Sequence, residues 1–232
     1  MNNQNNFETY LFINQKKFIL RVIHNTSFET IYSEEMLLNE DRFNFEILDR
    51  FLEKNIFKVE KTLKNFIKNI YIILDSEDFF SVKFSIKKNN NNNYIDTNTL
   101  IYPLTDLKNS FYSNFSDRKI IHILIENYLI DNKKYSSLPK NIKCNFFCLD
   151  VNFISLSNNF IDDLEYVLKG YHILINRILS SDYIVNFSNQ IQKNIFTTAS
   201  RVKSGYNENE VSLVNKSSKN KGFFERFFNF FN

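Results

Sequence analysis

The ten residues His122 to Asp131, HILIENYLID, carry the clearest structural signal in this chain. His122 alternates with apolar neighbours, and such period-two alternation is typical of a β-strand. A second apolar segment, IKCNFFCLDVNFISL at 142–156, follows a short polar connection. We therefore predict two long strands, over 119–130 and 142–156.

The flanking segments predict an α+β fold. Apolar residues at helical spacing indicate an amphipathic helix over 41–57, and β-branched and aromatic residues at alternate positions indicate strands. Further strands are predicted at 10–13, 17–24, 28–32, 69–75, 80–86 and 171–179, and further helices at 104–115 and 159–169. We expect the first three strands to form a meander, and Gly170 to end the last helix as a C-cap glycine.

Changes in composition suggest four segments. The asparagine run at 89–93 predicts a surface loop and a subdomain boundary, which separates a first subdomain at 1–88 from an α+β module at 94–196. Apolar residues thin out over 197–221, where we expect a flexible linker. Residues 222–232 form a separate C-terminal segment.

Overall composition excludes several classes of protein. The 232 residues include 26 Phe and 12 Tyr but only 3 Gly, which A/T-rich codon usage explains. Net charge is +3 with both signs interspersed, so we expect no nucleic-acid partner. No apolar run approaches the roughly 20 residues that span a bilayer, and MNNQNN lacks the pattern of a secretory signal. We expect a protein on the cytoplasmic side of the membrane.

The C-terminal segment GFFERFFNFF, 222–231, is strongly amphipathic when drawn as a helix. Its phenylalanines fall in one arc: Phe223, Phe224, Phe227, Phe228, Phe230 and Phe231. Basic residues lie within or before it, among them Lys219, Lys221 and Arg226. Such a helix is too short to span lipid but can lie at an anionic membrane surface. We predict a membrane-binding helix, with docking in a protein groove or packing back on the chain as alternatives.

No motif predicts an enzyme, a cofactor or a metal site. Cys144 and Cys148 are four residues apart in a strand, which would place them on one face, and we expect both to be small, buried apolar residues. The remaining candidates are expected to be structural or solvated: His24, His122 and His172, and the acidic pairs Glu34–Glu35 and Asp162–Asp163.

The stretch HILIENYLID resembles a recurring segment of the bacterial cell-division protein FtsA, approximately H-V-I-P-Q-E-Y-x-I-D. His122, Tyr128, Ile130 and Asp131 match in register. Pro139 and Gly170 then fall where that family has a Pro-x-Gly turn and a later glycine, although Ile125 and Asn141 replace a proline and the turn glycine. The order of elements agrees over about 104–179.

This resemblance implies a truncated actin-like (ribonuclease H-like) half-domain, over about 10–87, joined to the strand-helix-strand-strand insert of FtsA. It also likens the C-terminal segment to FtsA's amphipathic membrane helix. The family's first phosphate-binding turn contains glycine, whereas this chain has 14–17, NQKK, and no glycine before Gly170. A phosphate cradle usually needs glycine for close backbone approach, so we expect no nucleotide.

The expected function is a non-catalytic scaffold of bacterial cell division, peripheral to the inner membrane and located at the division site. The expected partners are anionic lipids of the inner membrane and, through the FtsA-like insert, the cytoplasmic tails of membrane division proteins. Self-association and contact with FtsZ stay open. A membrane-recruited adaptor of another system, such as pilus assembly, or a helix-in-groove interaction module is the alternative.

Overall fold

The computed structural model describes residues 6–38, 43–188 and 194–211, which form two compact units. The first unit combines 1–78 with 158–204, and the second combines 79–157 with 205–232. The predicted boundary at 88–94 is therefore wrong: the first unit ends near residue 78, and the segment predicted as helix and strand at 159–179 returns to it.

The first unit contains a five-stranded mixed sheet in the order β3-β2-β1-β4-β9. Its strands are β1 (Phe7–Ile13), β2 (Lys17–His24), β3 (Thr30–Leu37), β4 (Asn69–Leu74) and β9 (Leu174–Ser180). The first three are antiparallel, which confirms the predicted meander, while β4 and β9 run parallel to β1. A meander followed by parallel strands is the ribonuclease H-like arrangement expected of half an actin-like fold.

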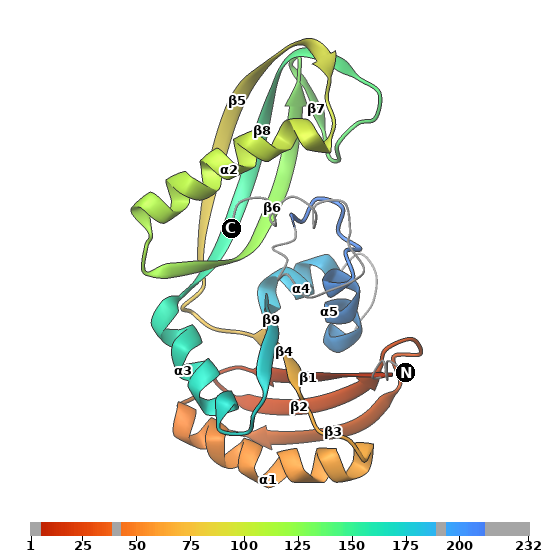
Figure 1. Ribbon diagram of the computed structural model, residues 1–232, viewed down its shortest axis with the longest axis vertical. Helices are drawn as coiled ribbons and strands as arrows, with labels where there is room; N and C mark the ends of the chain where they lie inside the picture. Colours follow the sequence, from red (N-terminus) through yellow and green to blue (C-terminus); the bar gives the residue numbers. More distant parts are fainter. Residues whose placement is uncertain (1–5, 39–42, 189–193, 212–232) are drawn as a thin grey trace. The chain divides into compact units, whose positions relative to one another are not determined.

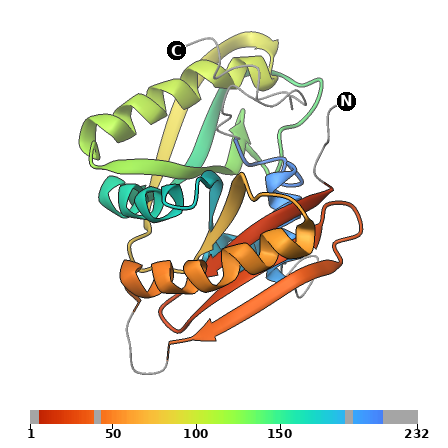
Figure 2. The same ribbon diagram turned by 60° about the horizontal axis from the view of Figure 1, so that its bottom comes forward.

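Four helices of the described residues belong to this unit. They are α1 (Phe45–Leu63), α3 (Asn158–Lys169), α4 (Ser181–Ser188) and α5 (Ile195–Lys203). Helix α1 lies across one face of the meander, where the Phe51 and Phe18 rings are 5.8 Å apart (Figure 2). It begins later than predicted because the Asn44 side chain accepts a hydrogen bond from the Ile47 amide, and it continues to Leu63.

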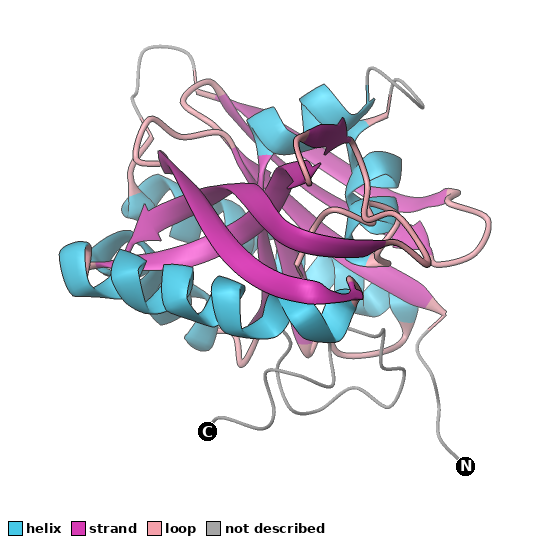
Figure 3. Cartoon of the chain, turned by 90° about the horizontal axis from the view of Figure 1, so that it is seen from above, coloured by secondary structure: helices cyan, strands magenta, loops and turns pink. Residues whose placement is uncertain are grey.

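The second unit contains an antiparallel sheet in the order β5-β8-β6-β7, with one long helix. Its elements are β5 (Phe80–Tyr94), α2 (Thr97–Asn114), β6 (Arg118–Ile130), β7 (Lys133–Tyr135) and β8 (Lys143–Ser157). Helix α2 runs along the twisted long strands (Figure 3) and buries Phe111 against Phe153. The overall α+β class and the two long strands are as predicted.

The HILIENYLID segment ends in a tight hairpin turn between β6 and β7. Asp131 and Asn132 both have positive φ, 43° and 68°, as a two-residue type I′ turn requires. The Asp131 carboxylate also accepts hydrogen bonds from the backbone amides of Asn145 and Phe146, at 3.0 and 3.1 Å. One side chain therefore fixes both the turn and the start of β8.

Two predictions about the β5–β8 pair are wrong for one shared reason. Residues 89–93 form no boundary loop but continue β5 through a bulge, where Asn91 and Asn92 adopt positive φ. The same irregularity shifts the alternation of side chains along β8, so that residues an even number of positions apart can lie on opposite faces. Cys144 is buried in the core beneath α2, whereas Cys148, opposite Lys87, lies on the other face of the sheet.

The predicted end of the helix at 169 is confirmed, but the left-handed glycine cap at Gly170 and the linker predicted to begin at 197 are wrong. Helix α3 ends at Lys169, but the left-handed residue is His172, with φ 59°, rather than Gly170. The interval 197–203 belongs to α5 rather than to a flexible linker, because Phe196, Ala199 and Val202 are buried against the first sheet. No helix among the described residues is long and apolar enough to cross a membrane.

Candidate functional site at the carboxyl edge of the first sheet

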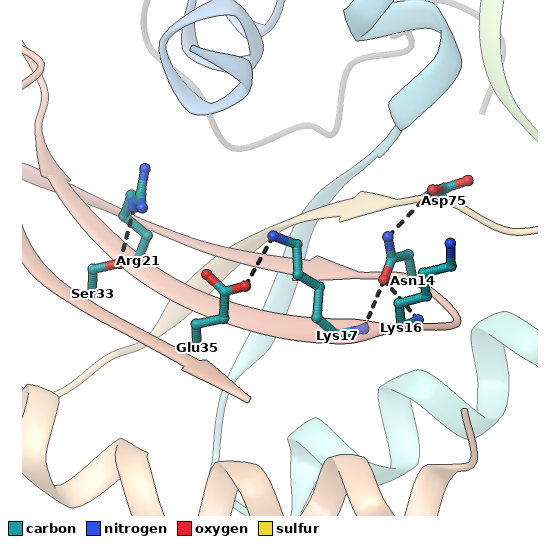
Figure 4. A network of polar contacts seen from close by, with 7 residues as sticks. All are labelled: Asn14, Lys16, Lys17, Arg21, Ser33, Glu35 and Asp75. Atoms are coloured by element: carbon teal, nitrogen blue, oxygen red, sulfur yellow. Dashed lines mark hydrogen bonds and ion pairs between the residues drawn. The ribbon is translucent and has the colours of Figure 1, made fainter. Parts of the chain in front are cut away.

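The parallel strands of the first sheet bring their carboxyl ends to one edge. Ligands of open α/β sheets bind outside such edges, so a binding site is expected at this edge. Asn14 follows β1 and Asp75 follows β4, and the Asp75 amide donates a hydrogen bond to the Ile13 carbonyl at 2.9 Å. The Asn14 side-chain amide also lies 3.5 Å from the Asp75 carboxylate, a contact at the limit of hydrogen bonding (Figure 4).

The turn between β1 and β2 uses its own side chain to satisfy its backbone. Asn14 Oδ1 accepts hydrogen bonds from the amides of Lys16 and Lys17, at 2.9 and 2.8 Å, while the Asn14 amide donates to the Lys17 carbonyl. A phosphate cradle needs free backbone amides that point at the ligand. Two amides of this turn point at Asn14 instead, so the turn is built as a closed Asx turn.

Charged side chains continue from this turn along β2 (Figure 4). Lys17 Nζ lies 2.9 Å from the Glu35 carboxylate, and Arg21 Nε donates to Ser33 Oγ at 3.1 Å. Burial lowers the pKa of Arg21, although Glu35 opposes that shift. These contacts join β2 to β3 across an exposed face, and no nucleophile paired with a histidine lies in the network. Its evident role is to hold the meander together.

A second polar cluster attaches α5 to the first sheet. The Glu8 carboxylate accepts hydrogen bonds from Tyr10 Oη at 2.6 Å and Ser200 Oγ at 2.9 Å, and it forms an ion pair with Lys203. Burial, together with Glu8, raises the pKa of Tyr10. Because Lys203 compensates the half-buried carboxylate, this cluster fixes the end of α5 to β1.

The second unit exposes a polar face on the side of its sheet away from α2. Ser85 Oγ and Asn127 Nδ2 both donate to the Asp150 carboxylate, at 2.6 and 3.1 Å. Lys83 forms an exposed ion pair with Glu126 at 2.9 Å. These contacts run across β5, β8 and β6, so the face is ordered, polar and open to water. Such a face suits protein contact better than the binding of an apolar ligand.

The segment after α5 joins the second unit at the edge of β6. The Ile125 amide donates to the Asn209 carbonyl and the Val211 amide donates to the Ile123 carbonyl, both at 2.9 Å. Glu210 lies between the two residues of this segment that make these bonds; its Oε1 is 2.7 Å from His122 Nδ1, and the Glu210 and His122 side chains are 2% and 0% exposed. His122 is buried, as expected of a structural residue. The role of Glu210 was missed because it lies in a polar sequence without an apolar signal.

The predicted membrane-binding residues fall outside the described part of the chain. This holds for all nine of them, from Lys219 to Phe231, and for the linker beyond Val211. The acidic pairs that were considered as candidates lie apart from one another, on β3 and on α3, and all four carboxylates are exposed. Among the described residues, no group of three His, Cys, Asp or Glu could hold a metal ion.

Comparisons with known proteins find similar solved structures at low sequence identity. No protein-family model matches the sequence, and no curated protein matches it. The cytoplasmic domain of EpsL, an inner membrane component of the type II secretion system of Vibrio cholerae, is 13% identical with a TM-score of 0.38; the match covers 77% of this chain and 58% of that one.

Two further solved structures are similar. The PilM–PilN type IV pilus biogenesis complex matches at 6% identity and a TM-score of 0.47, over 86% of this chain and 69% of that chain. A Bacteroides thetaiotaomicron protein with an actin-like ATPase fold and unknown function matches at 16% identity and a TM-score of 0.30, over 80% and 56%. This chain thus spans less than two thirds of EpsL's cytoplasmic domain. Scores below 0.5 transfer neither activity nor partners.

Proposed function

We propose that this chain is a non-catalytic scaffold of bacterial cell division, held at the cytoplasmic face of the inner membrane. The C-terminal helix over 222–232 binds anionic lipid. The second unit, which contains the FtsA-like motif, contacts the cytoplasmic tails of membrane division proteins. The observation that carries this proposal is the segregation of six phenylalanines from the polar residues of the tail, next to basic residues.

The magnitudes favour weak, reversible attachment by one tail. Full burial of six Phe side chains would contribute roughly 9–18 kcal/mol, but burial at an interface is partial. Ordering ten residues costs on the order of 10–20 kcal/mol of backbone entropy before helical hydrogen bonds are credited. Durable attachment therefore requires several tails acting together.

The described residues are compatible with a scaffold. The closed turn at Asn14 offers two fewer amides to a phosphate, which supports the expectation of a nucleotide-free protein. The polar face around Asp150 supplies ordered exposed groups for a protein partner. The pairing of 209–211 with β6 means that the segment leading to the tail leaves from the second unit's sheet.

A membrane-recruited adaptor of another system, such as pilus assembly, is the second candidate. The departures from the FtsA pattern at Ile125 and Asn141 favour it, since both fall inside the segment that carries the resemblance. A fluorescent fusion distinguishes the two. We expect concentration at midcell for the division scaffold, whereas a polar or uniform membrane signal supports the adaptor.

Lipid binding is tested by co-sedimentation with vesicles that contain phosphatidylglycerol. Phe227→Glu and deletion of 222–232 should both abolish binding at low salt, because each removes apolar area from the membrane-facing arc. Phe66→Glu is the matched control: Phe66 is 72% exposed in the first unit, so the same substitution there should leave binding unchanged. Equal lipid binding by the wild type and the deletion would overturn the proposal.

A further inference from the structure

Two edge strands of this chain carry opposite charge. Among the described residues β3 pairs only with β2, and β5 pairs only with β8 (Figure 1). Strand β3 contains Glu34 and Glu35 and no basic residue. Strand β5 contains Lys83, Lys87 and Lys88 and no acidic residue. Each edge offers backbone donors and acceptors that a further strand could use.

On each of these two strands, two neighbouring charged residues point to opposite faces of the sheet. Glu35 lies opposite Ile19, on the side of the sheet that carries Lys17, while Glu34 lies opposite Leu20, on the α1 side. In the second sheet Lys87 lies opposite Cys148, on the polar face, and Lys88 lies opposite Phe147, on the α2 side. Consecutive residues thus present one charge per face on either strand.

We propose that β3 of one copy of this chain pairs in antiparallel fashion with β5 of a second copy. One register sets Glu35 opposite Lys87 and Glu34 opposite Lys88. The same register sets Met36 opposite Ile86, both partly buried apolar residues, on the side covered by α1 and α2. A parallel pairing that matched the charges would instead set Met36 opposite Asn89. Side-chain matching on both faces therefore selects the antiparallel arrangement.

Charges on edge strands ordinarily prevent pairing, and here they disfavour pairing between like edges. Pairing β3 with β3 sets glutamates against one another, and pairing β5 with β5 does the same for lysines. Only the unlike pair is attractive. Glu35 and Lys88 also have exposed partners within the chain, Lys17 and Asp106, but exposed ion pairs are weak and can be shared.

The unlike contact is heterologous, so a copy that pairs through its β3 edge keeps its β5 edge for a further neighbour, and a copy that pairs through its β5 edge keeps its β3 edge. Such contacts close into rings or extend into filaments. This inference does not rest on membrane binding. An assembly of this kind would, however, place many C-terminal tails side by side, which supplies the multivalency that one weak tail lacks.

The test uses full-length chains that all carry Phe227→Glu, so that the tail cannot drive association. Two variants are compared with this parent by sedimentation velocity at low salt: Glu34→Lys/Glu35→Lys and Lys87→Glu/Lys88→Glu. The parent should associate as concentration rises, and each variant should associate at least about fourfold more weakly. An equimolar mixture of the two variants should regain association, because the basic β3 of one meets the acidic β5 of the other.

Asp162→Lys/Asp163→Lys is the matched control, since it makes the same change of charge on the exposed face of α3. It should associate like the parent. Circular dichroism establishes that each variant is folded. A monomeric parent, variants that associate as well as the parent, or a mixture that stays monomeric would each overturn the proposal.

A covalent test addresses the register directly. In a Cys148→Ser background, Met36→Cys/Ile86→Cys should give a ladder of disulfide-linked chains under oxidising conditions, because directly opposite residues bring their Cβ atoms within about 5.5 Å. Tyr32→Cys/Ile86→Cys places the two thiols four positions apart in the proposed register and should give no ladder. A ladder from the second pair alone would contradict the antiparallel register.

Discussion

The contact between His122 and Glu210 should decide whether the segment 205–211 stays attached to β6. Replacing Glu210 by Ala leaves His122 buried without this carboxylate, which costs about 1–3 kcal/mol for a neutral hydrogen bond and about 3–5 kcal/mol for an ion pair. The backbone bonds at Ile125 and Val211 contribute only about 0.5–1.5 kcal/mol each. The loss is therefore large enough to release the segment while the rest of the second unit stays folded.

Native-state hydrogen exchange measures this release. The Ile125 amide, which donates to the Asn209 carbonyl, should exchange about 100-fold faster or more in the Glu210→Ala variant. The Phe115 amide, which donates to the Phe111 carbonyl at the end of α2, should keep its rate. Glu208→Ala is the control, because Glu208 is exposed. Unchanged protection of Ile125 would refute the reasoning, and equal acceleration of Phe115 would show that the pair supports the whole unit.

Three further predictions concern stability. Asn14→Ala should lower the free energy of unfolding in urea by about 1–2 kcal/mol, because the Lys16 and Lys17 amides lose their side-chain acceptor; an unchanged midpoint would contradict this role. Thr9→Val should leave the melting temperature unchanged or raise it, since Thr9 Oγ1 is buried and has no hydrogen-bond partner within the described part of the chain; a marked fall in the melting temperature would contradict this. Burial raises the pKa of Tyr128 to about 12. The protonated Tyr128 side chain therefore contributes at most about 2.7 kcal/mol to the free energy of unfolding. This contribution is complete below pH 10 and is lost as the pH rises from 10 to 12. Denaturation across this range should show the loss, and Tyr128→Phe should reduce it.

The strands could be predicted well from the sequence because a strand with one buried face has apolar residues at alternate positions. In β6, Ile123 and Ile125 face the core beneath α2, and this spacing alone indicates a strand. The β1–β2 meander was predicted for the same reason. Helix α1 was found from its apolar face, but its bounds were wrong because the cap at Asn44 and the residues beyond Phe57 carry weaker signals.

The errors arise where long-range contacts override local composition. Asparagine-rich sequence usually indicates a loop, yet pairing with β8 keeps 89–93 within β5, where a bulge accommodates the surplus residues. The polar sequence around Thr198 resembles a linker, but α5 is held by Glu8, which lies some 190 positions earlier in the chain. Glu210 gives no local signal either, because its partner His122 is 88 residues away.

The attachment of 209–211 also bears on how a membrane-bound tail would hold the protein. If the tail binds lipid, a pulling force on the tail acts on the described chain at Val211. It therefore loads the bonds to β6 before it loads α5. Releasing 205–211 would add seven residues to the tether, or up to about 25 Å of reach. A longer flexible tether lowers the effective concentration of neighbouring sites. Glu210→Ala should therefore weaken the binding of assembled chains to vesicles while the binding of a single tail is unchanged, and equal weakening of both would instead indicate damage to the tail's own contact with lipid.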